Sequence, residues 1–390
     1  MPIFLTDLNI EEVQKLVTSL GLPSYRAKQL LIWIYQRLAV SLNEMIDLPQ
    51  SLRRKLAEQV TLHTLTPAHE VKAKDGTVKV LFSLHDGNTV ETALMSYPVG
   101  HDRQGRLSHQ NNSGLVAQAS VPVGKKTEQA SAPVGKTKSY RYTICLSTQV
   151  GCPIGCPFCA TGQQGFERNL TPGEIIDQVL YFARYLRDKS NGREGERISN
   201  IVFMGMGEPL ANYDALWQAI EILNSPDGFG LGARSMTIST AGLIPGIKRL
   251  SAEKLQVGLA ISLHAADNKL RDKLVPINKK YPLDELISAC REYFVRTGRR
   301  VSFEYALFKG INDSLAQAQL LAAMIQGMNC HVNLISANST ANQTLPPSPH
   351  GQILAFQQAL KNRGINCTLR QSRGQDINAG CGQLRSRFLT

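Results

Sequence analysis

The stretch from Thr143 to Leu170, TICLSTQVGCPIGCPFCATGQQGFERNL, holds four of the eight cysteines of this 390-residue chain. Cys152, Cys156 and Cys159 form the spacing C-x3-C-x2-C, and Cys145 precedes them. Three thiolates this close together can bind one metal cluster, but a four-iron cluster takes four ligands. One iron would lack a protein ligand, and that open position could bind and activate a small molecule.

Zinc is the alternative metal for clustered cysteines. Structural zinc sites usually pair C-x2-C with a second pair of Cys or His residues. The nearest later candidates, His264 and Cys290, lie about a hundred residues or more beyond the loop. The spacing therefore favours an iron–sulfur cluster over a zinc site.

The three-cysteine loop, followed by aromatic and glycine residues, resembles the cluster loop of radical S-adenosylmethionine (SAM) enzymes. The resemblance implies a [4Fe-4S] cluster whose fourth iron binds the amino and carboxylate groups of SAM. An electron from the cluster would then cleave SAM to a 5'-deoxyadenosyl radical. The cofactor would supply the radical chemistry, and the protein would supply placement.

Composition gives the class of partner and the compartment. Lys and Arg total 43 against 31 Asp and Glu, a net charge of +12 that favours a polyanionic partner, although ordinary surface charge is the alternative. The cysteines are bunched, and neither a secretory signal nor a run of about 18 apolar residues occurs. We therefore expect a cytoplasmic protein that does not enter a membrane.

The first hundred residues change from helical to β-type patterning. Residues 1–60 predict a small helical module, with Thr6 or Asp7 capping the first helix, and its basic residues could contact RNA or simply face solvent. Residues 61–98 predict a β-hairpin linker that turns at residues 85–88. Glu91 lies in its second strand, where a lone carboxylate is ordinarily exposed.

Residues 99–139 have a low-complexity composition of Gly, Ser, Gln, Asn, Pro and Lys. ASVPVGKKT at 119–127 recurs as ASAPVGKTK at 130–138, which indicates a duplicated insert. Two short polar copies bury nothing, so we expect a disordered loop. The insert carries six basic and two acidic residues, and part of the net positive charge therefore belongs to it.

From residue 140 to 390, strand and helix patterns alternate. This alternation predicts a parallel sheet in a partial or full (β/α) barrel. The expected strands cover 141–148, 201–206, 235–240, 257–263, 301–307, 331–336 and 365–370, and the expected helices cover 171–188, 213–224, 245–251, 283–296, 314–327 and 349–363.

Unusual residues fall at the ends of these strands, where a (β/α) barrel carries its chemistry. Each motif alone is weak evidence, but all of them would open on the same rim. They are the three-cysteine loop, GMGEP with Gly207 and Glu208, STAG with Ser239, SLH with Ser262, Leu263 and His264, and Asn338.

A second cysteine site follows in RQSRGQDINAGCGQL. Cys381 lies between Gly380 and Gly382, which would let a large ligand approach its thiol. Arg370 and Arg373 lie nearby, and cationic neighbours favour a reactive thiolate. Three other cysteines fit buried positions in helix or strand patterns: Cys290, Cys330 and Cys367.

Taken together, TICLSTQVGC, ATGQQGF, GMGEP, STAG, SLHA and RGQDINAGCGQL resemble the RlmN/Cfr family of radical SAM enzymes over nearly the whole chain outside the insert. Where the family has Pro-Trp-Asn, this chain has Ser336, Ala337 and Asn338. The resemblance implies three sets of residues: cluster ligands Cys152, Cys156 and Cys159; SAM contacts Gly207, Glu208, Ser239, Ser262, Leu263, His264 and Asn338; and catalytic residues Cys381, Cys145 and Glu91.

The resemblance also implies a reaction. Two SAM molecules would serve each turnover, one to methylate Cys381 and one to generate the radical, with Glu91 as proton acceptor and Cys145 as the resolving thiol that forms a disulfide. The substrates would be an adenosine in the peptidyl-transferase region of 23S rRNA and the adenosine beside the anticodon in some tRNAs. A reductant would reopen the disulfide, and we expect a monomer.

Two competing interpretations stay open. The first is a Cfr-type enzyme that methylates C8 of adenine and confers antibiotic resistance, although ATGQQGF favours methylation at C2. The second, from a different class, is a zinc-stabilised RNA-binding protein without catalysis. Cys145 and Cys381 in matching contexts argue against the second.

Overall fold

The computed structural model describes residues 3–101, 107–108, 140–190, 196–338 and 345–385, so most of the low-complexity insert lies outside the described residues. Its principal element is a ten-stranded sheet with the order β16-β15-β14-β13-β12-β11-β8-β5-β4-β3. Within the described residues the two edge strands do not pair, and the sheet is a partial barrel, as predicted.

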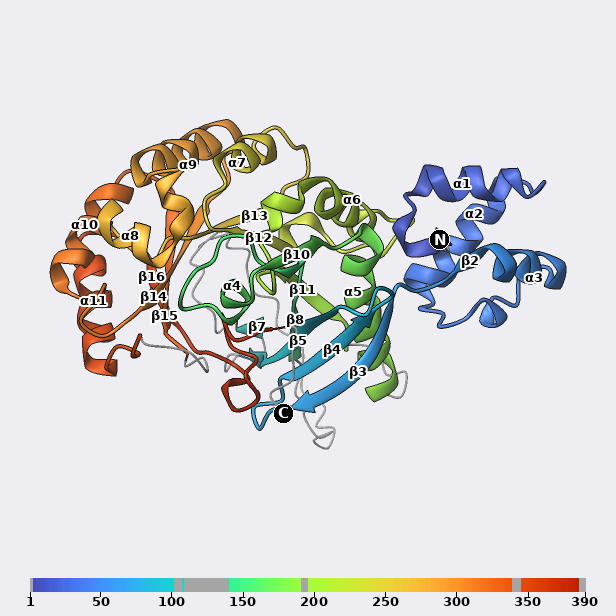
Figure 1. The fold of residues 1–390 in the computed structure, drawn as a ribbon, viewed down its shortest axis with the longest axis horizontal. Helices are drawn as coiled ribbons and strands as arrows, with labels where there is room; N and C mark the ends of the chain where they lie inside the picture. Colours follow the sequence, from blue (N-terminus) through green and yellow to red (C-terminus); the bar gives the residue numbers. More distant parts are fainter. Residues whose placement is uncertain (1–2, 102–106, 109–139, 191–195, 339–344, 386–390) are drawn as a thin grey trace, which may run out of the picture.

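Seven parallel strands form the barrel part of this sheet (Figure 1). The strands are β8 (Tyr140–Cys145), β11 (Ile198–Phe203), β12 (Met236–Thr240), β13 (Gly258–Ser262), β14 (Val301–Leu307), β15 (Cys330–Ser336) and β16 (Cys367–Arg370). The helices between them are α4 (Ala160–Gln164), α5 (Pro172–Lys189), α6 (Tyr213–Asn224), α7 (Ile244–Leu250), α8 (Asn268–Leu274), α9 (Leu283–Thr297), α10 (Leu315–Ile325) and α11 (His350–Asn362).

Three antiparallel strands extend the sheet beyond β8: β3 (Leu65–Lys72), β4 (Val78–Leu84) and β5 (Thr89–Pro98). The predicted turn at 85–88 joins β4 to β5, and Gly87 takes a positive φ there. The region predicted as a linker is therefore continuous with the barrel sheet. In the register, Ala93 lies opposite Cys145 and Tyr97 lies opposite Arg141. Two short strands follow β5, namely β6 (Gly100–His101) and β7 (Leu107–Ser108).

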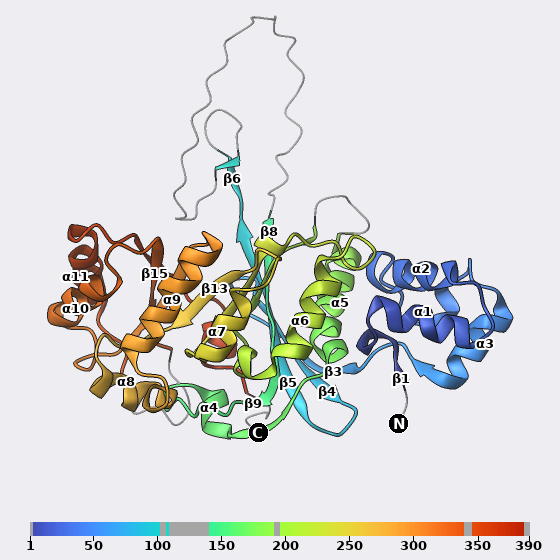
Figure 2. The same ribbon diagram turned by 90° about the horizontal axis from the view of Figure 1, so that it is seen from above.

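The N-terminal helical module lies beside α5 and α6, at one end of the molecule (Figures 1 and 2). It contains α1 (Ile10–Ser19), α2 (Tyr25–Leu31) and α3 (Gln50–Gln59), and β1 (Ile3–Phe4) pairs with β2 (Val60–Thr61). The predicted cap of the first helix is wrong, because Asn9 forms a capping box with Glu12. Asp7 instead accepts the N–H of Gly173 at the start of α5, 2.8 Å away.

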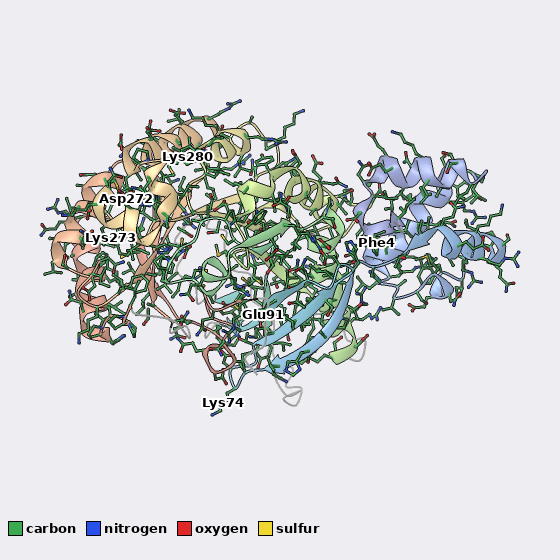
Figure 3. All side chains as sticks on the ribbon, in the orientation of Figure 1. Phe4, Lys74, Glu91, Asp272, Lys273 and Lys280 are labelled. Carbon is green, nitrogen blue, oxygen red and sulfur yellow. The ribbon has the colours of Figure 1, made fainter. Side chains whose placement is uncertain are left out.

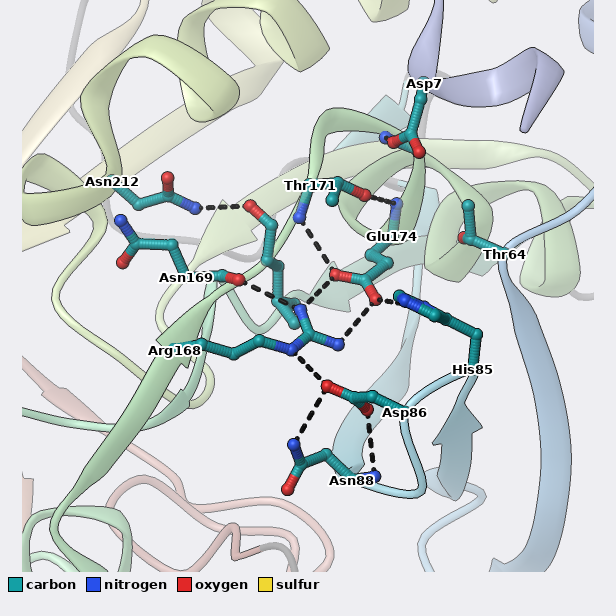
Figure 4. A network of polar contacts seen from close by, with 12 residues as sticks. Asp7, Thr64, His85, Asp86, Asn88, Arg168, Asn169, Thr171, Glu174 and Asn212 are labelled. Carbon is teal, nitrogen blue, oxygen red and sulfur yellow. Dashed lines mark hydrogen bonds and ion pairs between the residues drawn. The ribbon is translucent and has the colours of Figure 1, made fainter. Parts of the chain in front are cut away.

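Arg168 joins the strand that leaves the cysteine loop to two other parts of the fold (Figure 4). It lies in β10 (Phe166–Asn169), which pairs with β9 (Gln149–Gly151). Its guanidinium donates two hydrogen bonds of 2.8 Å to Glu174 in α5 and pairs with Asp86 in the β4–β5 turn. The ion pair with Arg168 lowers the pKa of Asp86. The network thus fixes the exit of the cysteine loop against the hairpin that carries Glu91.

Two further predictions concern burial and membranes. Cys290, Cys330 and Cys367 are buried, as expected for small apolar residues. In the part of the chain that the structure describes, no helix has both the length and the apolar character to span a membrane.

Candidate active site

One cavity opens at the carboxyl ends of the parallel strands and collects most of the predicted site residues. Leu263 and Glu91 do not line it. The predicted residues that do are Cys145, Cys152, Cys156, Cys159, Gly207, Glu208, Ser239, Ser262, His264, Asn338 and Cys381.

The cysteine loop is folded tightly on its own backbone. The N–H of Cys152 donates to the carbonyl of Gly165 at 2.7 Å. The N–H of Cys159 donates to the carbonyl of Cys156 at 3.1 Å. Gly162 is required by this packing, because a Cβ there would lie 2.8 Å from the nitrogen of Cys156. The loop therefore presents its three thiols on a compact frame.

The donor set fits an iron–sulfur cluster. Burial raises the pKa of Cys152 to about 12, so an uncoordinated thiolate is disfavoured there and metal coordination would have to stabilise it. Among the described residues, no three His, Cys, Asp or Glu side chains converge to hold one metal ion. A four-iron cluster would take one thiolate from each of these three cysteines and leave one iron open.

The GMGEP segment joins the end of β11 to the loop after β12. Gly207 has φ +106°, and a Cβ there would lie 2.7 Å from the side chain of Gln149. Glu208 is buried and accepts the N–H groups of Ala241 at 2.7 Å and Leu210 at 3.1 Å. Burial raises the pKa of Glu208, while these hydrogen bonds oppose the rise. The carboxylate thus ties the loop after β11 to the loop after β12.

His264 ends the neighbouring strand in a strained conformation. Its φ is +59°, and its Nδ1 accepts the N–H of Ala306 at 3.0 Å. Burial lowers the pKa of His264 to about 3, so the ring is neutral and its proton is on Nε2. Ser239 and Ser262 lie next to each other on adjacent strands, with 3.4 Å between their hydroxyl oxygens.

The Cys381 segment closes the opposite side of the cavity. Asn338 donates to the carbonyl of Cys381 at 3.1 Å. Gly380 lets two amide side chains pack against the backbone, because a Cβ would lie 2.7 Å from both Asn338 Nδ2 and Gln383 Oε1 and would displace these side-chain ends. The carbonyl of Gly382 accepts the N–H of Ala160 at 2.8 Å, which joins this segment to the helix after the cysteine loop.

The thiols of Cys145 and Cys381, which lie outside the three-cysteine loop, face the same cavity. All eight cysteines of the chain are free. Burial raises the pKa of Cys145 to about 12, and the neighbouring Cys381 adds to the rise. The surrounding walls also raise the pKa of Cys381, with Arg370 opposing. The charge of Arg370 thus acts to lower the pKa of Cys381, as expected, although Arg370 also pairs with Glu304 at 3.1 Å. Arg373 packs on Tyr97 with 5.0 Å to the ring centre, and Cys381 itself is exposed.

Glu91 is buried in β5, contrary to the usual exposure of a lone strand carboxylate (Figure 3). It pairs with Lys79 at 2.8 Å and accepts the N–H of Arg385 at 2.9 Å. Burial raises the pKa of Glu91, while Lys79 opposes the rise. The contact with Arg385 connects Glu91 to the segment that carries Cys381.

Sequence patterns missed Arg271, which lies in α8 behind the cavity wall. Its side chain is completely buried and donates to main-chain carbonyls at the ends of β12 and β13. Only its position between two recognised strands could have drawn attention to it.

A partial barrel with three cysteines at the carboxyl rim defines the class of radical SAM enzymes. The radical SAM superfamily pattern matches residues 146–318 of the chain. A crystal structure of a radical SAM methyltransferase from Sphaerobacter thermophilus superimposes with a TM-score of 0.85 at 43% identity, over 99% of this chain and 100% of that one. The enzyme therefore uses a [4Fe-4S] cluster and SAM.

The chain belongs to the RlmN family of radical SAM methyltransferases. Residues 3–62 match the ribosomal RNA large subunit methyltransferase N-terminal domain. The chain is 41% identical over 380 residues to the probable dual-specificity RNA methyltransferase RlmN of Geobacillus kaustophilus, covering 97% of this chain and 92% of that protein. It is 43% identical to the ribosomal RNA large subunit methyltransferase N of Nitrosopumilus maritimus, with 96% of each chain covered.

Proposed function

We propose that this enzyme methylates C2 of an adenosine in 23S rRNA and in some tRNAs, with Cys381 as the methyl carrier. The observation that carries this proposal is the shared cavity: Cys381 and Cys145 open onto the same space as the three-cysteine loop. C2 of adenine lies between two ring nitrogens and is electron-poor. It would not attack the methyl group of SAM as an ordinary nucleophile would.

The cofactors have residues to hold them. Cys152, Cys156 and Cys159 would ligate the cluster, and the strand ends from Gly207 to His264, with Asn338, would contact SAM. When bound, the cluster and SAM supply a 5'-deoxyadenosyl radical that removes one hydrogen atom from a methylated thiol.

Cys381 would act first as a nucleophile and then as a carrier. Its thiolate attacks the methyl carbon of one SAM, the bond between that carbon and the sulfonium sulfur breaks, and S-adenosylhomocysteine leaves. After loss of a hydrogen atom, the S-bound carbon adds to C2 and joins the base covalently to Cys381. The adenine must leave its stacked position to reach this cavity, as bases do in enzymes that modify them.

Glu91 and Cys145 would complete the reaction. Glu91 would take the C2 proton once its side chain turns from Lys79 and Arg385 towards the cavity, which it does not line in this structure. Its raised pKa makes it a better base than an exposed carboxylate. The radical adduct gives up one electron, for which the oxidised iron–sulfur cluster would be the acceptor, and the thiolate of Cys145 then attacks the sulfur of Cys381. The carbon–sulfur bond breaks with its electron pair on the carbon, and that carbon takes up a proton, for which the protonated Glu91 would be the donor, to become the methyl group. A Cys145–Cys381 disulfide remains. An external dithiol or electron-transfer protein reduces this disulfide before the next turnover.

The RNA partner fits the charge of the chain. The net charge is +12, and the N-terminal module has basic residues such as Arg26 and Lys28 in α2. We propose that this module holds the RNA backbone while the barrel receives the base, and that the enzyme acts as a monomer in the cytoplasm.

Nucleoside mass spectrometry tests the reaction. Cluster-loaded protein is incubated anaerobically with 23S rRNA or tRNA, SAM and a reductant, beside the Cys381→Ala variant. We expect 2-methyladenosine with the parent enzyme and none with the variant. Formation of 8-methyladenosine, or no methylated adenosine despite an intact cluster, would contradict the proposal.

A further inference from the structure

Arg271 makes an unusually complete set of hydrogen bonds for a buried cation. It is fully buried, and all three nitrogens of its guanidinium donate. The acceptors are Leu263 O at 3.1 Å from Nε, Asn278 Oδ1 at 3.0 Å from Nη1, and Ala241 O at 2.6 Å and Ser262 O at 3.2 Å from Nη2.

Three of these acceptors belong to the backbone that borders the cavity. Ala241 follows β12, while Ser262 and Leu263 end β13, and both Ala241 and Ser262 line the cavity. Arg271 itself does not line it. Any influence of this side chain on a ligand must therefore pass through the backbone that it holds.

The guanidinium is held in turn from behind. Asn278 accepts from Arg271 and donates to Asp272 at 2.7 Å and to the side chain of Asn268 at 3.0 Å. Arg271 and Asp272 occupy the middle of α8, on the outer layer of the barrel, where Figure 3 marks Asp272. The planar fork of an arginine suits several fixed acceptors, whereas a lysine ammonium would reach fewer of them.

A buried charge with this many partners is costly to disturb. Removing the guanidinium would leave three main-chain carbonyls in the protein interior without this donor, and buried polar groups need partners. The ends of two adjacent strands would then be free to shift together. This shift of the strand ends would follow without the substitution of any residue that lines the cavity.

We propose that Arg271 is a positioning residue for SAM: it fixes the main chain of Ala241, Ser262 and Leu263 in the orientation that the SAM site requires. This inference rests on the proposed assignment of SAM to the strand-end side of the cavity. Arg271 is predicted to affect SAM affinity without touching SAM.

Calorimetric titration of SAM into cluster-loaded protein tests the proposal, with Arg271→Met and Arg271→Lys beside the parent. We expect Arg271→Met to raise the Kd for SAM about tenfold or more, in the range seen when groups that orient a binding site are removed. Arg271→Lys should recover part of this loss, and the KM for RNA should stay within about twofold of the parent value.

Arg291→Met is the control. Arg291 is half-buried, whereas Arg271 is fully buried. Arg291 also donates to two main-chain carbonyls, those of Met324 at 3.0 Å and Gln326 at 3.1 Å, and it does not line or border the cavity. We expect this variant to lose thermal stability and to keep the parent Kd for SAM. A purely structural role for Arg271 predicts instead that both arginines act alike, on stability alone.

The outcomes separate cleanly. If Arg271→Met does not fold, Arg271→Lys decides, and a Kd for SAM at least about threefold above that of Arg291→Met supports the proposal. Parent-like SAM affinity in the folded Arg271 variants would overturn it. If the parent binds SAM but forms no 2-methyladenosine, the proposed function fails while the affinity comparison still stands.

Discussion

The two sides of the cavity are built differently. The sheet side, formed by the ends of β11, β12 and β13, is fixed by buried charged groups that bind main-chain atoms, namely Glu208 and Arg271. On the loop side, residues 374–384, neutral amides hold the backbone around Cys381, with Asn338 on the carbonyl of Cys381 and Gln383 on the N–H of Gly380. Charged groups act at the start of this segment, where Asp75 accepts the N–H of Gly374 and Asp376 accepts that of Lys74. They also act at Asn378, whose carbonyl accepts from Lys79. The charged contacts of the sheet side suit a ligand that is held in one pose. The neutral contacts suit the thiol of Cys381, which must react in turn with SAM, the adenine base and Cys145.

The largest loss of methylation should follow substitution of a cluster ligand, because the reaction on both sides of the cavity depends on the cluster. We expect Cys156→Ala to lose the cluster and to bring methylation below detection, because two thiolates do not hold a four-iron cluster. Iron and sulfide analysis with nucleoside mass spectrometry measures both. Cys290→Ala, a buried cysteine in α9, is the control and should keep its iron. Full iron content in Cys156→Ala would contradict the assignment.

A smaller loss should follow from crowding the loop side. Gly380→Ala places a methyl group 2.7 Å from the ends of the Asn338 and Gln383 side chains, which must shift to make room at a cost of about 1 kcal/mol or slightly more. We expect methylation to fall about fivefold to tenfold, with a smaller rise in the Kd for SAM because Asn338 is displaced. Gly351→Ala, with no heavy atom within 4 Å of the added Cβ, should have no effect on either quantity. An equal loss in both variants would remove the distinction between the two sides.

Asn338→Ala should show which side this residue serves. It removes the hydrogen bonds to the carbonyl of Cys381 and from Gln375, each of which stabilises by about 1 kcal/mol. Because Asn338 is also a proposed SAM contact, we expect methylation to fall about fivefold, the Kd for SAM to rise, and hydrogen exchange to rise in residues 374–384. Unchanged exchange would contradict its role on the loop side, and an unchanged Kd would contradict its contact with SAM.

The smallest effect on methylation is expected in the sheet away from the cavity, where a substitution changes the pH dependence of stability. His331 in β15 is buried next to Thr368, and burial lowers its pKa to about 4. The unfolded chain binds this proton near pH 6.5, so the contribution of His331 to stability is present above pH 6.5 and is lost as the pH falls towards 4. We expect His331→Gln to reduce the loss of unfolding free energy between pH 7 and 5 by up to about 2 kcal/mol, measured by urea denaturation. An unchanged pH dependence would contradict a neutral, buried His331.

Local pattern predicted the sheet side well. Strand β14 covers 301–307 as predicted, and the motifs after successive strands meet at one rim because parallel strands end on the same edge. Contacts between distant residues were predicted less well. Asp7 binds Gly173 instead of capping its own helix. The charge of Arg370 acts to lower the pKa of Cys381 as expected, but Arg370 is also paired with Glu304, 66 residues away in the sequence.

Arg271 also shows that local sequence pattern does not reveal contacts between distant residues. Its helix, α8, has a mostly polar sequence, and nothing in its local pattern indicates a fully buried cation. The carbonyls that accept from Arg271 lie 8 to 30 residues away along the chain. Only the packed structure brings these groups together.

The most direct test of the account is to remove Cys145 and look for RNA attached to Cys381. In the proposed reaction, the base is joined to Cys381 before Cys145 releases it. Cys145→Ala should therefore accumulate a covalent adduct between an adenosine of the RNA and the peptide that contains Cys381. Nuclease and protease digestion followed by mass spectrometry would detect it. Release of free 2-methyladenosine at the parent rate, with no adduct on Cys381, would contradict the account.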